Sequence, residues 1–436
     1  MDFLRRESVE NQGTSSLDIK IAGDGKVEFT AKLVDAWKVV AYSRIANRIL
    51  MHIADFKAEN FRELERKAAE VPWELYLDKK HGSALRQSSG TSQQVSIHVT
   101  CKHSRLYHSD AVAERLQKVI AHQAERFLHL KASETSDLEP RASSLHVTLI
   151  DDRCTLWLDL AGEELYKRGH ERFVNDAPLK ETIAAGMLQE ACSQPSPPCL
   201  LPTSYCLLDL MSGSGTFSLE AAYMANGLIP GKCRDFVLKH QPAFKPATWN
   251  HIVNSANANP NPSLRRNEVT AAIKSPIQKI VTSDISERAV EIIKHNVECC
   301  PLADIAPSAN APTINPQLRD FFSYTAKEIA DLCGESAPVI VLNPPYGKRL
   351  DFDAPKLYTQ IGKKLAELAR ELAPLGKQLT VAILAPKDDS RPGSKYTCTA
   401  NLQHECPALD PQQNSDAKCI VTSHGGLSLN AIIARI

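Results

Sequence analysis

The later half of the chain alternates between short apolar runs and longer segments whose apolar residues recur with helical spacing. Val339 to Leu342 form an unbroken apolar run, which is typical of a central parallel strand buried on both faces. Strands and helices that alternate in this way predict a doubly wound parallel sheet. The expected strands are residues 206–210, 279–284, 313–320, 339–345 and 379–386, the expected helices are 182–192, 215–226, 286–298 and 352–373, and a closing hairpin spans 419–436 through Gly425 and Gly426.

The earlier half of the chain shows strict alternation of apolar and polar positions. In residues 94–101, every second residue is apolar, which predicts a half-buried strand. Residues 145–160 alternate on both sides of a polar Asp-Asp-Arg segment, which predicts a hairpin. With a strand at 26–33 and helices at 33–49, 59–71 and 109–128, these elements predict a small α+β domain that ends near residue 165.

A glycine-rich segment follows the first strand of the predicted parallel sheet. Asp209 ends that strand, and Gly213 and Gly215 open the next helix. Glycines at this position let the backbone approach a ligand closely, and a helix N-terminus attracts negative charge. The segment is no Walker loop, and Ser218 stands where a dinucleotide fingerprint has its third glycine. A glycine turn that serves only packing is the alternative.

Acidic residues end the next two predicted strands. Asp284 ends the strand at 279–284, where a carboxylate can accept hydrogen bonds from both hydroxyls of a ribose. Its distance from the glycines exceeds the usual interval of about twenty residues, which an insertion rich in Asn and Pro at 252–275 would explain. An Asp that only stabilises the helix dipole is the alternative. Asp320 ends the least distinct strand, 313–320.

Asn343, Pro344, Pro345 and Tyr346 directly follow the buried strand. Proline lacks a backbone N–H, so the strand stops and Asn343 lies at its carboxyl end, where open α/β sheets bind ligands. The side-chain oxygen of Asn343 and the carbonyl of Pro344 could accept both hydrogens of an exocyclic amine and direct its lone pair at a methyl donor. Tyr346 offers a flat face to an extruded base. A plain strand-ending turn is the alternative.

Charge limits the partners of the chain. Its 51 basic and 51 acidic residues exclude a uniformly basic coat, so any nucleic-acid surface must be local. In residues 98–131, six basic residues outnumber three acidic ones, although a solvated helix face gives the same pattern. The basic residues of this patch are Lys102, Arg105, Arg115, Lys118, Arg126 and Lys131. Beside the expected base pocket, Gly347 would leave room for the base, and Lys348 and Arg349 would meet phosphates.

Twelve cysteines are scattered along the chain without a Cys-x-x-Cys pair, which favours a reduced, cytoplasmic protein. Cysteines at 192–206 and a Cys/His cluster at 398–419 lack the close pairs of metal sites, so we expect no metal. The polar start of the chain and the absence of an apolar run of 18 residues predict a soluble protein with no membrane partner.

Together these motifs resemble class I S-adenosylmethionine-dependent methyltransferases that act on exocyclic amino nitrogens. More closely, "DLMSGSGTFSLEAAYMA", "SDISERAVEIIKHN" and "NPPYGKRL" look like the catalytic domain of bacterial large-subunit ribosomal RNA guanine-N2 methyltransferases. Residues 99–120 and 146–169 look like the THUMP domain of this family, and 177–191 look like its connector. Leu210 and Ser212 depart from the Pro and Cys that are usual in the family's glycine loop.

The resemblance implies a fold, a cofactor and site residues. A Rossmann-like methyltransferase domain with a closing antiparallel hairpin would follow an α+β ferredoxin-like/THUMP region that binds RNA, although the ferredoxin-like element lacks its first strand and helix. The implied divisions are a polar tail at 1–25, a partial ferredoxin-like element at 26–80, a THUMP domain at 81–165, a connector at 166–181 and the methyltransferase domain at 182–436. The implied S-adenosylmethionine site comprises Asp209, Ser212, Gly213, Ser214, Gly215, Asp284 at the ribose, Asp320 at the adenine, and Asn343, and the implied catalytic residues are Asn343, Pro344, Pro345 and Tyr346.

The expected reaction is N2-methylation of a guanine in large-subunit (23S) ribosomal RNA, free or in a pre-50S particle. The Asn-Pro-Pro-Tyr motif alone does not choose among adenine N6, guanine N2 and a glutamine amide. A transfer RNA guanine-N2 methyltransferase and a catalytically silent RNA-binding or assembly factor are the alternatives. The sequence does not predict an oligomeric state.

Overall fold

A computed structural model describes most of the chain, which divides into two compact units. One unit comprises Met1–Thr30, Tyr166–Cys233 and Ala256–Ile436, and the other comprises Ala31–Leu165 and Arg234–Ser255. The described residues are 18–23, 25–77, 95–128, 144–174, 178–192, 204–255, 277–302, 312–346, 353–389 and 397–436. The predicted contact residues Gly347, Lys348 and Arg349 lie outside them, as does Lys131 of the basic patch.

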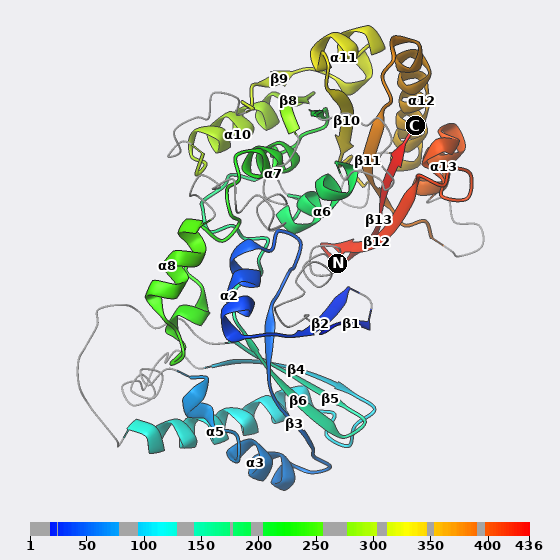
Figure 1. Cartoon of the computed structure of the whole chain (residues 1–436). Helices are drawn as coiled ribbons and strands as arrows, with labels where there is room; N and C mark the ends of the chain where they lie inside the picture. Colours follow the sequence, from blue (N-terminus) through cyan, green and yellow to red (C-terminus); the bar gives the residue numbers. More distant parts are fainter. Residues whose placement is uncertain are drawn as a thin grey trace. The chain divides into compact units, whose positions relative to one another are not determined.

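A seven-stranded mixed sheet forms the centre of the first unit (Figure 1). Its order is β12-β13-β11-β10-β7-β8-β9, in which β11, β10, β7, β8 and β9 are parallel and the closing hairpin is antiparallel. Positive φ angles at Gly425 and Gly426 make the tight hairpin turn. The predicted doubly wound sheet is therefore confirmed. The strands are β7 Tyr205–Asp209, β8 Ile277–Asp284, β9 Pro316–Leu318, β10 Ala337–Leu342, β11 Thr380–Pro386, β12 Lys418–His424 and β13 Leu427–Arg435.

Helices cover both faces of this sheet because its central strands are apolar on both sides. Val339 and Val341 of β10 pack with residues of α6, α7 and α10, whereas Ile340 and Leu342 pack with residues of α11, α12 and α13. The helices are α6 Glu181–Ala191, α7 Thr216–Ala225, α10 Glu287–Glu298, α11 Ala326–Cys333, α12 Ala354–Leu372 and α13 Cys398–Glu405, with short 3-10 turns η3 Phe321–Ser323, η4 Ala373–Leu375 and η5 Pro407–Leu409. The spacing of apolar residues did not predict α11 and α13.

A two-stranded antiparallel ribbon forms the first described part of the chain. Strand β1, Asp18–Gly23, pairs with β2, Lys26–Thr30, around a turn at Gly25 with a φ of 68°. Residues 18–23, which were expected to belong to a polar tail at 1–25, instead form a strand. The polar composition concealed β1 because an exposed ribbon does not need a run of buried side chains.

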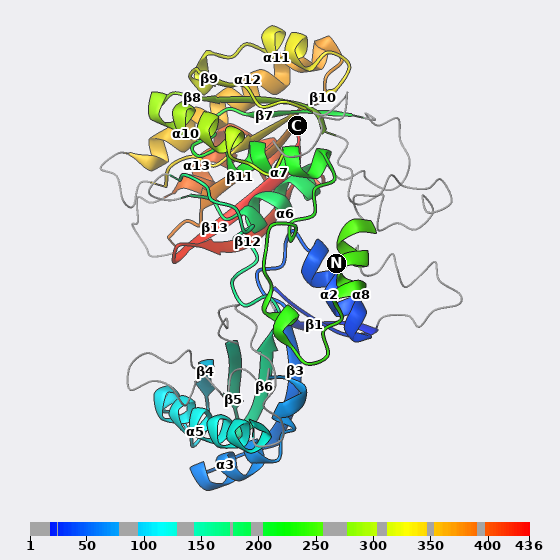
Figure 2. The same cartoon turned by 90° about the vertical axis from the view of Figure 1, so that its left-hand side faces the viewer.

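The second unit contains a four-stranded sheet in the order β3-β6-β5-β4, with β4 and β5 parallel and the other pairs antiparallel. Asp151 and Asp152, both with positive φ, form the predicted β5–β6 turn. Figures 1 and 2 show α3 and α5 on the same face of this sheet. The elements are α2 Leu33–Tyr42, β3 Leu50–Lys57, α3 Phe61–Ala69, η1 Trp73–Leu75, β4 Ser96–Lys102, α5 Ser109–Leu128, β5 Ser144–Ile150, β6 Arg153–Asp159, η2 Val237–His240 and α8 Pro246–Ser255.

A segment from later in the sequence completes the core of the second unit. Trp249 and Ile252 of α8 are buried in one cluster with Trp37 of α2, and the Tyr42 hydroxyl donates a hydrogen bond to the Ile252 carbonyl. The earlier prediction placed these residues within the methyltransferase domain. The division at 81, 166 and 182 and the THUMP assignment stay predictions. Within the described residues, no helix is long and apolar enough to cross a membrane.

Candidate active site

The predicted site residues gather at the carboxyl ends of four adjacent strands, β10, β7, β8 and β9. Asp209 lies opposite Val341 in the register of β7 and β10, so Asn343 begins two residues beyond that pair. Asp284 pairs with Leu318 at the other side, which places Asp320 just beyond the end of β9. The topology therefore brings all the predicted positions to one edge of the sheet, where ligands bind in open α/β folds.

Hydrogen bonds hold the glycine loop against the end of β8. Gly213 has a φ of 54° and donates its N–H to Asp284 Oδ2 at 2.8 Å, while Ser286 N–H donates to Asp284 Oδ1 at 2.9 Å. Ser212 donates both its N–H and its hydroxyl to the Ser283 carbonyl. Asp284 remains partly exposed, and each carboxylate oxygen keeps a lone pair for a further donor.

The two glycines of the loop have different surroundings. A Cβ on Gly213 would meet no atom within 4 Å, so this residue borders open space. A Cβ on Gly215 would lie 3.0 Å from Ile293 Cγ1, and the φ of Gly215 is 77°. Gly215 therefore permits close packing of the loop on α10, whereas Gly213 leaves the loop backbone accessible to a ligand.

Asp209, the last residue of β7, lies beneath the glycine loop in the sense that its side chain is fully buried inside the fold. Its Oδ2 accepts hydrogen bonds from the Ser218 N–H at 3.1 Å and the Ser218 hydroxyl at 2.7 Å. Burial raises the pKa of the Asp209 carboxyl to about 7, against the lowering effect of Ser218. Its Oδ1 is buried without a hydrogen-bond partner among the described residues. Ser218 thus ties the start of α7 to β7 at the position where a dinucleotide fingerprint has glycine.

Asp320 caps the short turn η3. Its Oδ1 accepts the Phe322 N–H at 3.1 Å, and its carbonyl accepts the Ser323 hydroxyl at 2.7 Å. The preceding residue, Arg319, donates its backbone N–H to the Asp284 carbonyl. The two acids therefore lie on chain segments that are joined directly by a backbone hydrogen bond.

The segment from Asn343 to Tyr346 leaves β10 with its polar groups partly accessible. Asn343 and Tyr346 are half-buried, Pro344 is buried and Pro345 is exposed. The Tyr346 hydroxyl donates to Asn343 Oδ1. This bond uses one lone pair of the amide oxygen that was predicted to accept an amine hydrogen, and the second lone pair remains.

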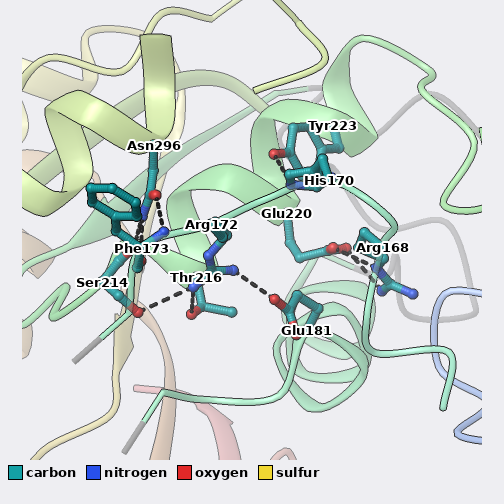
Figure 3. A network of polar contacts seen from close by, with 10 residues as sticks. All are labelled: Arg168, His170, Arg172, Phe173, Glu181, Ser214, Thr216, Glu220, Tyr223 and Asn296. Atoms are coloured by element: carbon teal, nitrogen blue, oxygen red, sulfur yellow. Dashed lines mark hydrogen bonds and ion pairs between the residues drawn. The ribbon is translucent and has the colours of Figure 1, made fainter. Parts of the chain in front are cut away.

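The connector before α6 contributes a network that the sequence analysis did not identify (Figure 3). Arg172 donates to Thr216 Oγ1 at 2.7 Å and Ser214 Oγ at 3.1 Å, and it forms an ion pair of 2.8 Å with Glu181. Its Nε is buried without a hydrogen-bond partner among the described residues. A single guanidinium thus links the glycine loop to the first residues of two helices.

Neighbouring contacts fix the same connector on α7 and α10. Arg168 forms a buried two-point contact with Glu220, with bonds of 2.8 and 3.2 Å. The Asn296 side chain accepts a hydrogen bond from the Phe173 N–H and donates one to the Phe173 carbonyl. It also donates to the Ser214 carbonyl. A charged run, "YKRGHERF", was the only signal in the sequence, and charge alone did not reveal the partners Ser214, Glu220 and Asn296, which lie 42 to 123 positions away.

The predicted basic patch is largely paired. Arg105 lies beside Glu59 and Asp152, Arg115 beside Glu65, and Lys118 beside Glu114. Such exposed pairs are weak, so phosphates could compete for these cations, but the net positive field is smaller than the residue count indicates. Across the part of the chain that the structure describes, no group of three or more His, Cys, Asp or Glu side chains is placed to hold a metal.

The parallel sheet, the glycine loop and the Asn-Pro-Pro-Tyr segment define a class I methyltransferase. Residues 168–382 match the family model "UPF0020: RMKL-like, methyltransferase domain".

Relatives extend this likeness beyond the matched domain. The "Ribosomal RNA large subunit methyltransferase K/L" of Psychromonas ingrahamii is 26% identical over 344 residues, which cover 78% of this chain and 40% of the relative. The "Putative RNA methyltransferase slr0064" of Synechocystis is 26% identical over 85% of this chain and 84% of its own length. The crystal structure of SMU.472 complexed with SAH aligns with a TM-score of 0.65 and 21% identity over 99% of this chain and 95% of its own. The chain spans only about two fifths of the length of the first K/L relatives.

Proposed function

We propose that the chain transfers a methyl group from S-adenosylmethionine to the N2 amine of a guanine in large-subunit ribosomal RNA. The observation that carries the proposal is the juxtaposition of Asn343–Tyr346 at the end of β10 with the glycine loop at the end of the adjacent β7. The K/L relatives support methylation of this polymer, since their name states a methyltransferase of large-subunit ribosomal RNA. The choice of guanine N2 rests on the resemblance of the sequence motifs. A cytoplasmic location is part of the same proposal.

The residues of the glycine loop fit the cofactor. Open space beside Gly213 would admit its methionine portion, and the partly exposed Asp284 carboxylate has lone pairs for ribose hydroxyls. Asp320 is proposed beside the adenine because it follows the neighbouring strand. Asp209, Ser212 and Ser214 would act indirectly, since their side chains are buried and bind protein atoms. The bound cofactor supplies an electrophilic methyl group on a sulfonium.

The segment after β10 would prepare the amine. Asn343 Oδ1 and the Pro344 carbonyl accept its two N–H groups, which favours tetrahedral nitrogen and frees the lone pair for attack. Tyr346 stacks on the base. The cofactor would supply the methyl group and keep the electron pair of the broken sulfur–carbon bond, and the nitrogen would lose its proton after the transfer, so no strong general base is needed.

The decisive measurement is methyl transfer from labelled S-adenosylmethionine to unmodified ribosomal RNA and transfer RNA in parallel, with separation of the product nucleosides. We expect N2-methylguanosine from the ribosomal RNA alone. The same nucleoside from transfer RNA alone would establish the alternative substrate. Cofactor binding without label in either RNA would direct the assay to a pre-50S particle, and RNA binding without cofactor binding would identify a silent binding factor.

A further inference from the structure

Four aromatic rings form one row across the second unit's sheet. The strand register places His98 opposite His146, His146 opposite Trp157, and Trp157 opposite His52. His98 and His146 are stacked with centroids 4.9 Å apart, and His52 meets Trp157 edge to face at 5.1 Å. The row thus crosses β4, β5, β6 and β3, so it includes a ring from every strand of the sheet.

The row lies on the face opposite α3 and α5. Val99, Val147 and Leu156, which alternate with the ring-bearing positions, pack in the core with residues of these helices. Because side chains alternate along a strand, the rings point to the other face. His52 and His98, on the two edge strands, are exposed, while His146 and Trp157 are half-buried.

Polar and basic rows run parallel to the rings on the same face. Two residues farther along stand Thr100, Thr148 and Thr155, which lie opposite one another in the register, and the row ends on β3 with the acidic Asp55 opposite Thr155. The next row contains Lys102, Arg153 and Lys57 together with Ile150. Rows two residues apart are separated by about 7 Å along the strands, so long basic side chains can reach groups bound over the hydroxyls.

The cations of this face are available to a polyanion. Arg153 pairs with Asp55 and Lys57 with Glu59, but the Arg153 and Lys57 side chains are 69% exposed. Exposed pairs contribute about 0–1 kcal/mol, so a phosphate can replace the carboxylate at little cost. The face therefore combines flat rings, hydroxyl groups and exchangeable positive charge.

We propose that this face binds a single-stranded RNA segment, with bases stacked on His52 and His98 and phosphates near Lys102 and Arg153. Stacking on sheet aromatics is sequence-tolerant because every base has a flat face. The proposal rests on the proposed function only in taking RNA as the polymer. It gives the second unit the task of holding an unpaired strand of the substrate RNA.

The test is the dissociation constant of the full chain for a fluorescein-labelled 12-nucleotide uridine oligomer and for a blunt RNA duplex of the same length. Replacing both outer rings by alanine, His52→Ala with His98→Ala, should weaken oligomer binding about tenfold or more. The matched pair His52→Phe with His98→Phe should retain binding within about threefold, because phenylalanine stacks without a charge. His404→Ala removes an exposed imidazole from the other unit and should change nothing.

Each other result overturns the proposal. These are no oligomer binding by the wild type, unchanged binding by the alanine pair, equal losses in the alanine and phenylalanine pairs, or equal ring dependence for the duplex. Cofactor affinity, measured separately by calorimetry, should be the same in all variants. Methyl transfer with ring-independent RNA binding would overturn this proposal alone, and ring-dependent binding without methyl transfer to either free ribosomal RNA or a pre-50S particle would overturn only the proposed function.

Discussion

The two larger sheets of the molecule bury their strands in different ways. In the seven-stranded sheet, Val339 to Leu342 of β10 are all fully buried, because helices cover both faces. In the four-stranded sheet, β4 alternates between half-buried and exposed residues. A sheet covered on both faces can present chemistry only at the ends of its strands, whereas a sheet covered on one face offers an entire surface to a ligand. The methyltransferase motifs accordingly lie at the strand ends of the seven-stranded sheet, and the row of rings lies on the uncovered face of the four-stranded sheet.

The same substitution in the two sheets gives the largest predicted contrast. Ile340→Thr in β10 should lower the free energy of unfolding by about 2–4 kcal/mol, because it removes apolar contacts and buries a hydroxyl. Ile150→Thr on the open face should change it by less than about 0.5 kcal/mol, since Ile150 is 45% exposed. Denaturant unfolding followed by circular dichroism measures both. Equal losses would show that the open face is covered in the folded protein.

At the end of the covered sheet, Asn343 should carry most of the chemistry. Asn343→Ala is expected to reduce turnover about 100-fold, because it removes an acceptor aimed at the reacting amine, while cofactor affinity stays nearly unchanged. Tyr346→Phe is the matched control, since it removes the hydroxyl that binds Asn343 Oδ1 but keeps a stacking ring. Single-turnover kinetics with saturating cofactor separates the two. Wild-type turnover in Asn343→Ala would exclude the proposed grip on the amine.

Asp284→Ala should weaken cofactor binding about tenfold, the loss typical of hydrogen bonds to a charged group. The variant removes both the proposed ribose acceptor and the partner of the Gly213 N–H. Glu287→Ala is its control, because it removes an exposed carboxylate only three residues away, in the first turn of α10. Calorimetric titration with S-adenosylhomocysteine measures both affinities. An equal loss in the two variants would mean that general electrostatics, and not the ribose contact, sets the affinity.

Periodicity predicted the central strands β7, β10 and β11 well because they are continuous, buried and largely apolar runs. It missed β3, in which a register shift between His52 and Ala54 breaks the alternation of inward and outward residues. It missed β1 because that ribbon is mostly exposed. The row of rings also depends on register, since His52 lies 105 positions from Trp157 in the sequence.

The site residues that directly follow a strand in the sequence were predictable, because the end of the strand fixes their position. Asn343 and the glycine loop follow their strands directly, so the strand ends placed them. Arg172 could not be found in this way, because its partners Ser214 and Thr216 become neighbours only when the connector folds onto α7. The buried state of Asp209 also depends on Ser218, whose hydroxyl holds the carboxylate inward.

The last predicted effects concern the pH dependence of stability and have opposite signs in the two sheets. Asp209 has an ordinary pKa of 3.8 that burial raises to about 7, so the folded state binds more protons and stability falls as the pH rises between these values. Burial and Arg48 lower the pKa of His146 below 6.5, so the unfolded state binds more protons and stability falls as the pH drops below that value. Each group contributes at most about 1.4 kcal/mol per pH unit. The measurement is the free energy of unfolding from pH 4 to 8. Relative to the wild type, the stability of Asp209→Asn should increase as the pH rises, and that of His146→Gln should increase as the pH falls. Differences independent of pH would contradict both assignments.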